Sequence, residues 1–384
     1  MQYFDHSATT PPYDEVAATV AQVMREFYGN PSSLHKIGGA AENLLEQARE
    51  VIARHMRVKP GEVIFTSGGT ESNNLAIKGV ARRFKSRGRH VITSAIEHPS
   101  VLQPFAELAS EGFRVTYLPV DKTGSVRTED VERALSDDTI LVSIMHVNNE
   151  MGRIQPIREI GNMLKKFPKI CFHVDAVQSV GKIPVYFKDW GIDLLSSSAH
   201  KFRGPKGIGF LLKREGLEIA PLIVGGGQEK GLRSGTENVP LIVGMAKALR
   251  MTMEQQANNM ELLYRYRAQL IDRLRRISAI AVTGSHEMPE MAPHIVHFTF
   301  PGMRAEVVVH ALEEKGYCVS SQSACSSGEE KPSRVLMAMG MSEAAAKSGI
   351  RVSMSPMHTA DDIAGIAEAI AATVDEFKKV VKTR

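Results

Sequence analysis

Residues 196–207 read Ser-Ser-Ser-Ala-His-Lys-Phe-Arg-Gly-Pro-Lys-Gly, and the expected fold follows from this stretch. Upstream, residues 170–175 read Ile-Cys-Phe-His-Val-Asp, an apolar, β-branched run that ends in a polar residue and predicts a short buried strand. A second apolar run, residues 191–195, leads into the first stretch. Neighbouring strands of one sheet would bring Asp175 and Lys201 to the same edge.

Asp175, Gln178 and Lys201 together suit one kind of cofactor chemistry. A lysine can form a Schiff base with the aldehyde of pyridoxal phosphate (PLP), and an aspartate can keep the ring nitrogen protonated so that the ring accepts electrons. Lysines are mostly solvated surface residues, so Lys201 alone carries little information. The combination of the three residues favours a PLP site.

Motifs along nearly the whole chain resemble NifS/IscS-like cysteine desulfurases, which belong to the class V aminotransferase family. The resemblance rests on His-Val-Asp-Ala-Val-Gln at residues 173–178 and Ser-Ala-His-Lys-Phe at residues 198–202. Further matches, in the family's order, lie at residues 3–10, 29–33, 323–325 and 350–351. The resemblance implies a PLP-dependent transferase of fold type I that converts L-cysteine to L-alanine and leaves the sulfur as a persulfide on an enzyme cysteine.

The resemblance also implies roles for residues at matching positions. Lys201 binds the cofactor, Cys325 is the nucleophile that takes the sulfur, and His98 stacks over the cofactor ring and moves protons. Arg351 grips the substrate carboxylate with its two-pronged guanidinium, and Asn149 lies near cofactor and substrate. The other expected cofactor contacts are Gly69, Thr70, Asp175, Gln178, Ser198 and His200.

The glycine-rich residues 225–238 can be read as only a flexible loop. By resemblance, Thr236 reaches the cofactor phosphate of the neighbouring subunit, which implies a homodimer with composite sites. A sulfur-acceptor protein is the other expected partner, in iron-sulfur cluster, tRNA-thiolation or thiamine pathways. Because the chain ends at Arg384 without the longer tail that some family members use to dock an iron-sulfur scaffold, a dedicated acceptor is the hypothesis.

Residues 63–74 combine a strand, two glycines, a hydroxyl residue and the start of a helix. Free amides and the dipole at a helix N-terminus favour an anion, so Gly69 and Thr70 are candidate phosphate contacts. Thr70 can also serve only as a helix cap. The stretch lacks the GxxxxGK[ST] pattern, so a nucleoside triphosphate is not expected.

His98 and Asn149 each have a plain structural alternative. His98 precedes Pro99, where a histidine is usually a turn residue, and Asn149 lies in a loop where asparagine is a common turn residue. Both follow expected strands, at residues 90–93 and 139–145. Ligands of open α/β sheets lie beyond the carboxyl ends of the strands, which favours a site role for both.

Strands alternating with helices predict an α/β fold with a mostly parallel sheet covered on both faces, and the resemblance implies seven strands. A chain of 384 residues exceeds the usual single core and predicts about two domains. We expect a large PLP-binding domain at residues 13–257 and a smaller α/β domain of residues 1–12 with 258–384. A long helix from Leu241 to about Leu274, with an interruption near Asn258-Asn259, would join them.

Composition excludes several classes of protein. The formal net charge is only +4, and no Lys/Arg block resembles a nucleic-acid-binding arm. Three cysteines are too few for a disulfide framework and fit a reducing cytoplasm. We expect no signal peptide and no membrane span, since the N-terminus lacks a basic and apolar leader and no 18 apolar residues run together. His294 and His297, three apart, would point to opposite faces of a strand, so no metal site is expected.

Cys325 lies in residues 320–332, a polar stretch rich in small residues that predicts a mobile surface loop. Cys171 and Cys318 have apolar neighbours and fit the buried role that free cysteines usually have. Two other functions stay open: selenocysteine lyase or another class V aminotransferase reaction, which needs no nucleophilic Cys325, and a non-catalytic partner protein. The intact set of Lys201, Asp175, Gln178 and His98 counts against the second.

Overall fold

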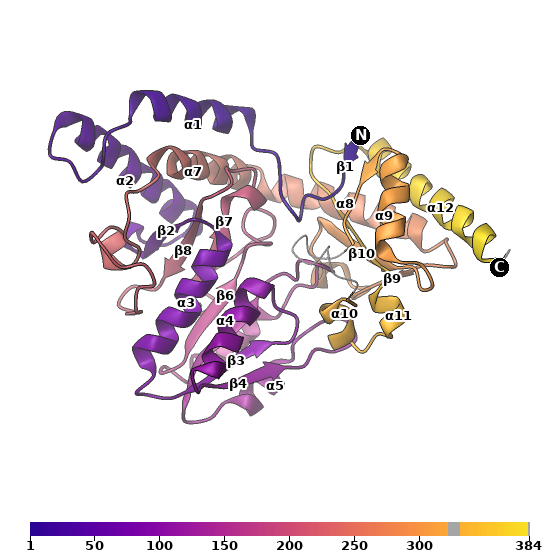
Figure 1. Cartoon of the computed structure of the whole chain (residues 1–384), viewed down its shortest axis with the longest axis horizontal. Coiled ribbons are helices and arrows are strands. Elements are labelled where there is room, and N and C mark those ends of the chain that lie inside the picture. Colours follow the sequence, from indigo (N-terminus) through magenta and orange to yellow (C-terminus); the bar gives the residue numbers. More distant parts are fainter. Residues whose placement is uncertain (322–330, 383–384) are drawn as a thin grey trace.

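The computed structural model of the chain describes residues 1–321 and 331–382, and its largest element is a seven-stranded sheet (Figure 1). The strand order is β2-β8-β7-β6-β5-β3-β4, and only β8 runs antiparallel to its neighbours. This confirms the expected mostly parallel seven-stranded sheet. The strands are β2 (Val63–Thr66), β3 (His90–Ser94), β4 (Arg114–Leu118), β5 (Thr139–Met145), β6 (Cys171–Asp175), β7 (Leu194–Ser198) and β8 (Gly209–Lys213).

Strands β6 and β7 are parallel neighbours, as expected from the sequence. Asp175 at the end of β6 pairs with Ser196 of β7. The chain then continues through the 3₁₀ turn η2 (Ala199–Lys201), so Asp175 and Lys201 leave the sheet at the same edge. Both strands are buried along their whole length, because a parallel sheet with two covered faces takes apolar residues on each.

Helices cover both faces of this sheet. The alternation of side chains along β6 shows the two faces: Phe172 and Val174 belong to one apolar core and Cys171 to the other. Helices α1, α2, α6 and α7 contribute to the first core and α3 and α4 to the second. The helix bounds are α1 (Asp14–Glu26), α2 (Lys36–Met56), α3 (Gly69–Phe84), α4 (Pro99–Ser110), α5 (Thr128–Ala134), α6 (Ile157–Leu164) and α7 (Val239–Glu254), with 3₁₀ turns η1 (Pro60–Glu62) and η3 (Glu229–Gly231).

The C-terminal part of the chain has its own sheet and its own apolar core. Its three-stranded sheet has the order β12-β10-β9, and β1 (Gln2–Tyr3) returns to pair with β11 (Tyr317–Cys318). The N-terminal residues therefore lie beside segments more than 300 positions away in the sequence. The domain boundaries after residues 12 and 257 stay a prediction. The remaining elements are α8 (Gln256–Leu274), β9 (Ala281–Val282), η4 (Met288–Glu290), β10 (Ile295–Thr299), α9 (Ala305–Glu314), α10 (Arg334–Ala338), α11 (Glu343–Ala346), β12 (Gly349–Ser353) and α12 (Ala360–Lys382).

Two expectations about local structure were wrong. The long helix breaks at Gln255 and not near Asn258-Asn259, because Gln255 adopts φ −105° and ψ 0° and ends α7. Asn259 instead donates its backbone N–H to the Gln255 carbonyl within α8. Cys318 was expected to be buried, but it is only half-buried, because the two-residue strand β11 pairs with the equally short β1. None of the described helices is long and apolar enough to cross a membrane.

Candidate active site

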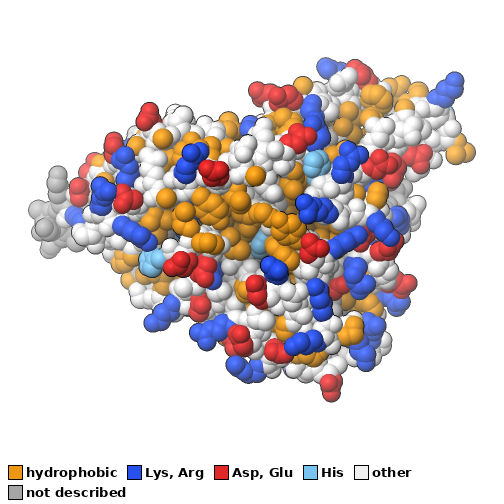
Figure 2. Space-filling model, turned by 180° about the vertical axis from the view of Figure 1, so that it is seen from behind, with side chains coloured by type: hydrophobic (Ala, Val, Ile, Leu, Met, Phe, Trp, Pro, Cys, Tyr) orange, Lys and Arg blue, Asp and Glu red, His pale blue; other side chains and the backbone are white. Residues whose placement is uncertain are grey.

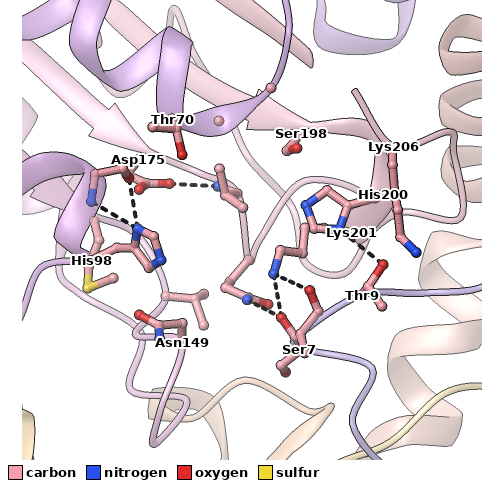
Figure 3. Close-up of a pocket in the computed structure, with 18 of the residues that line it drawn as sticks. Ser7, Thr9, Thr70, His98, Asn149, Asp175, Ser198, His200, Lys201 and Lys206 are labelled. Carbon is pink, nitrogen blue, oxygen red and sulfur yellow. Dashed lines mark hydrogen bonds between the residues drawn. The ribbon is translucent and has the colours of Figure 1, made fainter. Parts of the chain in front are cut away.

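A pocket of about 510 Å³ opens at the carboxyl ends of the strands. Its wall combines the N-terminal residues 7–9, the turn between β2 and α3, the ends of β6 and β7, and Arg351 from β12 (Figure 3). The seven-stranded sheet, the three-stranded sheet and the N-terminal segment therefore all contribute to it. The volume lies in the range of small-molecule and cofactor sites.

Lys201 enters the pocket from η2, directly after β7. Its Nζ donates hydrogen bonds to the backbone carbonyls of Ser7 at 2.6 Å and Ala8 at 2.8 Å (Figure 3). The N-terminal segment thus holds the ammonium group in place inside the pocket. A lysine amine so placed is the group that can bind a cofactor aldehyde covalently.

Asp175 lies buried at the end of β6. Its Oδ2 accepts a hydrogen bond from Asn73 Nδ2 at 2.8 Å, and its Oδ1 accepts one from the Val177 amide at 3.0 Å. These two bonds orient the carboxylate at the strand end. A buried carboxylate facing the pocket can hold a protonated ring nitrogen.

His98 caps the N-terminus of α4 and also lines the pocket. Its Nδ1 accepts the backbone N–H of Ser100 at 3.1 Å, which places the ring proton on Nε2. Burial lowers the pKa of His98 below its ordinary value, and the nearby Lys201 lowers it further while Asp175 opposes the shift. His98 therefore does both things considered from the sequence: it shapes the turn before α4, and it lines the pocket.

A buried chain of hydrogen bonds connects His98 to Asp175. The Oγ of Ser100 lies 2.8 Å from His98 Nδ1 and accepts a bond from Asn73 Nδ2 at 2.9 Å, and the same amide group bonds Asp175. Neither Asn73 nor Ser100 was expected to contribute. Asn73 and Ser100 both belong to motifs identified from the sequence, but their positions in the sequence do not predict that their side chains are in contact.

The start of α3 has the local geometry expected for the candidate anion site. The helix begins at Gly69, with Gly68 as N-cap at φ 151° and no side-chain cap bond, so Thr70 is not the cap. A Cβ on Gly69 would lie 2.7 Å from Val177 Cγ2, so only glycine lets this turn approach the end of β6. The first amides of the helix have no intrahelical acceptor and favour a phosphate.

Ser198 and His200 line the same end of the pocket. His200 Nδ1 lies 3.2 Å from Thr9 Oγ1, and burial together with Lys201, Lys182 and Lys206 lowers the pKa of His200 to about 4. The ring is therefore neutral near pH 7. Thr9, like Ser7, comes from the N-terminal segment, which no sequence signal placed in the pocket.

Gln178 shows that PLP fits these residues. Its Nε2 donates to the Ser7 carbonyl at 2.9 Å, whereas its buried Oε1 has no hydrogen-bond partner among the described residues. A buried acceptor without a donor is costly, and the ring hydroxyl of PLP is a donor of the right kind. This unpaired acceptor, the Gly69 turn, the Asp175 carboxylate and the Lys201 amine match the parts of the cofactor.

Arg351 is buried in β12 and already engaged on two sides. Its Nη2 forms an ion pair with Asp5 Oδ1 at 2.7 Å, and its Nη1 donates to the Asn149 carbonyl at 2.8 Å. Its Nε is buried and has no hydrogen-bond partner among the residues that the structure describes. Each Nη keeps a second hydrogen for a carboxylate, but Asp5 fixes the orientation of the guanidinium, a role the sequence did not indicate.

Most of the expected site residues meet in this pocket. Gly69, Thr70, His98, Asn149, Asp175, Gln178, Ser198, His200, Lys201 and Arg351 all line it. Thr236 does not line it, and its side chain is exposed. Cys325 lies outside the described residues.

The chain matches the family model described as aminotransferase class-V over residues 2–366. A NifS/IcsS protein homolog of Lactobacillus delbrueckii subsp. bulgaricus is 45% identical over 381 residues, covering 99% of each chain. The cysteine desulfurase IscS of Dictyoglomus turgidum is 43% identical over 379 residues, covering 98% of this chain and 95% of the relative.

Solved structures similar to this chain agree with the comparison of sequences. A structure described as a NifS-like protein superposes with a TM-score of 0.91 at 38% identity, covering 97% of this chain and 99% of that chain. A structure of SspA in complex with cysteine superposes with a TM-score of 0.81 at 39% identity, covering 94% of this chain and 100% of that chain. The likeness therefore extends over the seven-stranded sheet and the C-terminal part alike.

Proposed function

Because this chain belongs to the class V aminotransferase family and is a PLP-dependent cysteine desulfurase, we propose that Lys201 holds its cofactor and that Cys325 takes the sulfur of L-cysteine. The observation that carries the proposal is the convergence of Lys201, Asp175, Gln178 and His98 on one pocket of about 510 Å³. These residues come from the ends of β6 and β7 and from the N-cap of α4.

We assign each part of the cofactor to a group of this chain. Lys201 Nζ would bind the aldehyde, Asp175 the ring nitrogen, and Gln178 Oε1 the ring hydroxyl. The amides at the start of α3, with Thr70, Ser198 and His200, would bind the phosphate. When bound, PLP supplies an electron sink for chemistry at the substrate carbons.

His98 is the proposed proton carrier on one side of the pocket. Its Nδ1 is occupied by Ser100, so the exchangeable proton is at Nε2. Because burial lowers its pKa, the ring is neutral near pH 7, and Nε2 is the nitrogen left to exchange a proton with the substrate. Arg351, held by Asp5 and the Asn149 carbonyl, would bind the substrate carboxylate with the remaining hydrogens of its guanidinium.

Cys325 is the proposed nucleophile on grounds of sequence and chain length. Ser320 pairs with Arg351 through both backbone hydrogen bonds. Five residues separate Ser320 from Cys325 in the sequence, and an extended chain of that length spans at most about 18 Å. Attack of its thiolate on the substrate sulfur forms an S–S bond and breaks the C–S bond, whose electron pair is protonated to give the methyl group of alanine.

The decisive experiment is to incubate the holoenzyme with L-cysteine and measure alanine and protein-bound persulfide together in the first turnover. We expect equal amounts of both. A Cys325→Ala enzyme should bind cofactor and substrate but form neither product, whereas a selenocysteine lyase or aminotransferase would not need the thiol. Release of sulfur at the parental rate by Cys325→Ala would refute the assignment.

We further propose that two copies of the chain complete each other's sites through Thr236. In a single chain this residue is exposed and lies outside the pocket. Nearby, Ile223 and Val224 are 44% and 78% exposed, and the loop between α1 and α2 exposes Tyr28 and Leu34. Both loops lie at the same end of the molecule (Figure 1). Hydrophobic side chains also form a band across the face in Figure 2, and such patches usually mark interaction surfaces.

Subunit mixing tests this dimer. Lys201→Ala and Thr236→Asp proteins should each be inactive, the second because a carboxylate repels the cofactor phosphate. If Thr236 acts across the interface, a random hybrid has one intact site, and an exchanged equimolar mixture should recover about a quarter of the parental activity. No recovery after demonstrated subunit exchange, or a fully active monomer in sedimentation, would contradict the proposal.

A further inference from the structure

A small internal cavity of about 50 Å³ lies behind Lys201, separate from the cofactor pocket. It is lined by the N-terminal segment at His6, by the segment after β6 at Lys182, by α7 and α8, and by His294 just before β10. Lys201 is shared between this cavity and the pocket. The cavity therefore touches the reaction site without opening into the part assigned to cofactor and substrate.

Four buried polar atoms at this cavity have no hydrogen-bond partner within the described part of the chain. They are His6 Nδ1, Lys182 Nζ, and both ring nitrogens of His294. Lys182 is partly buried as a residue, and its ammonium group is fully buried. His294 is buried almost completely, at 1% exposure. An unsatisfied buried polar atom costs about 1–3 kcal/mol, so four in one place indicate that something fills the space.

The charges around the cavity are all of one sign. Lys182, Lys201 and Arg203 contribute cationic groups, and none of the described residues that line the cavity is an aspartate or glutamate. Burial, together with the positive charges of Lys201 and Arg351, lowers the pKa of Lys182 to about 7. A buried cation needs a counter-charge or loses its proton. The described residues of the lining supply no carboxylate, so a bound anion can serve as the counter-charge.

We propose that this cavity is a binding site for one small monovalent anion of about the size of chloride, held by Lys182 Nζ and the ring N–H groups of His6 and His294. A single water needs about 10–15 Å³ of such space, so the cavity can hold a halide and one or two waters. The anion would offset the repulsion between Lys182 and Lys201 and tie the segment after β6 to the C-terminal part of the chain at His294.

Bromide is the probe for this site, because it replaces chloride and scatters anomalously. Holoenzyme crystals grown in bromide should show an anomalous peak inside the cavity within hydrogen-bond distance of Lys182 Nζ. In solution, replacing sodium gluconate by sodium chloride at constant ionic strength should raise the melting temperature of the holoenzyme by about 2 °C and saturate. Gluconate is too large to enter the cavity.

Lys182→Met should remove both the bromide peak and the chloride-dependent rise. Lys213→Met is the matched control, because this half-buried lysine donates to the Leu217 carbonyl and does not line the cavity. Ordered water without anomalous signal at saturating bromide would overturn the proposal, and this measurement on the unmodified protein holds even if Lys182→Met fails to fold. An unchanged chloride response in Lys182→Met would overturn it too. Both readouts are independent of sulfur transfer, so they stand apart from the proposed function.

Discussion

Removal of the Asn73 amide tests the buried chain that joins Asp175 to His98. Asn73 Nδ2 donates at 2.8 Å to Asp175 Oδ2 and at 2.9 Å to Ser100 Oγ, and all three residues are buried. Asn73→Ala leaves Asp175 with one bond, from the Val177 amide. A hydrogen bond to a charged group contributes about 1.5–3 kcal/mol. If that bond orients the carboxylate for the cofactor, the variant should bind PLP about 10- to 150-fold more weakly.

The assay is a titration of the apoenzyme with PLP, followed by absorbance, on the variant and its neighbour. Asn74→Ala is the matched control, because Asn74 is only partly buried and its side chain bonds the Thr70 carbonyl, one turn back along α3. Its affinity should change by less than about threefold, as for typical surface changes. Asn73 Oδ1 is buried without a partner, so losing it offsets part of the stability cost of Asn73→Ala. Equal PLP affinity of Asn73→Ala and parental protein would refute the reasoning.

Three further changes test other parts of the molecule. Cys171→Ala should retain persulfide formation and lower the free energy of unfolding by only about 1 kcal/mol. This thiol is buried, and burial raises its pKa to about 12, so its role is in packing. Loss of sulfur transfer in this variant would contradict that role. Arg49→Met should lower the free energy of unfolding, measured in urea titrations, by about 3–5 kcal/mol. The change leaves the buried Glu229 carboxylate without the guanidinium that binds it at 2.8 and 3.0 Å. A loss of less than about 1 kcal/mol would show that the ion pair is dispensable. The free energy of unfolding should fall as the pH falls from about 6.5 towards 3. Burial lowers the pKa of His146, His173 and His297 to about 3 in the folded chain, whereas these histidines bind protons near pH 6.5 in the unfolded chain. Each of them should lower the free energy of unfolding by up to about 1.4 kcal/mol per pH unit in this range. Buried Glu97, whose pKa burial raises to about 8, acts in the opposite sense between pH 4.5 and 8, so a free energy of unfolding that rises as the pH falls from 6.5 to 5 would show that the histidine effect is absent.

Much of the fold and of the candidate site could be predicted from the sequence, because it depends on local patterns. A short apolar run marked strand β5 at its observed bounds. The turn with Gly69 indicated the anion site, and the alternation of strands and helices indicated a parallel sheet whose carboxyl ends carry the ligand. Asp175 and Lys201 could be placed at one edge since each directly follows a strand.

Other features depend on packing between residues far apart in the chain, and only the tertiary structure decided them. The Ser7 carbonyl accepts bonds from Lys201 and Gln178, more than 170 positions away, and the Asp5 carboxylate holds Arg351. The residues around Lys182 and His294 form a cavity only because separate segments of the chain pack together there. Periodicity describes which face of a helix or strand is apolar, but the partner of one side chain depends on how whole elements pack, and no local pattern contains that information.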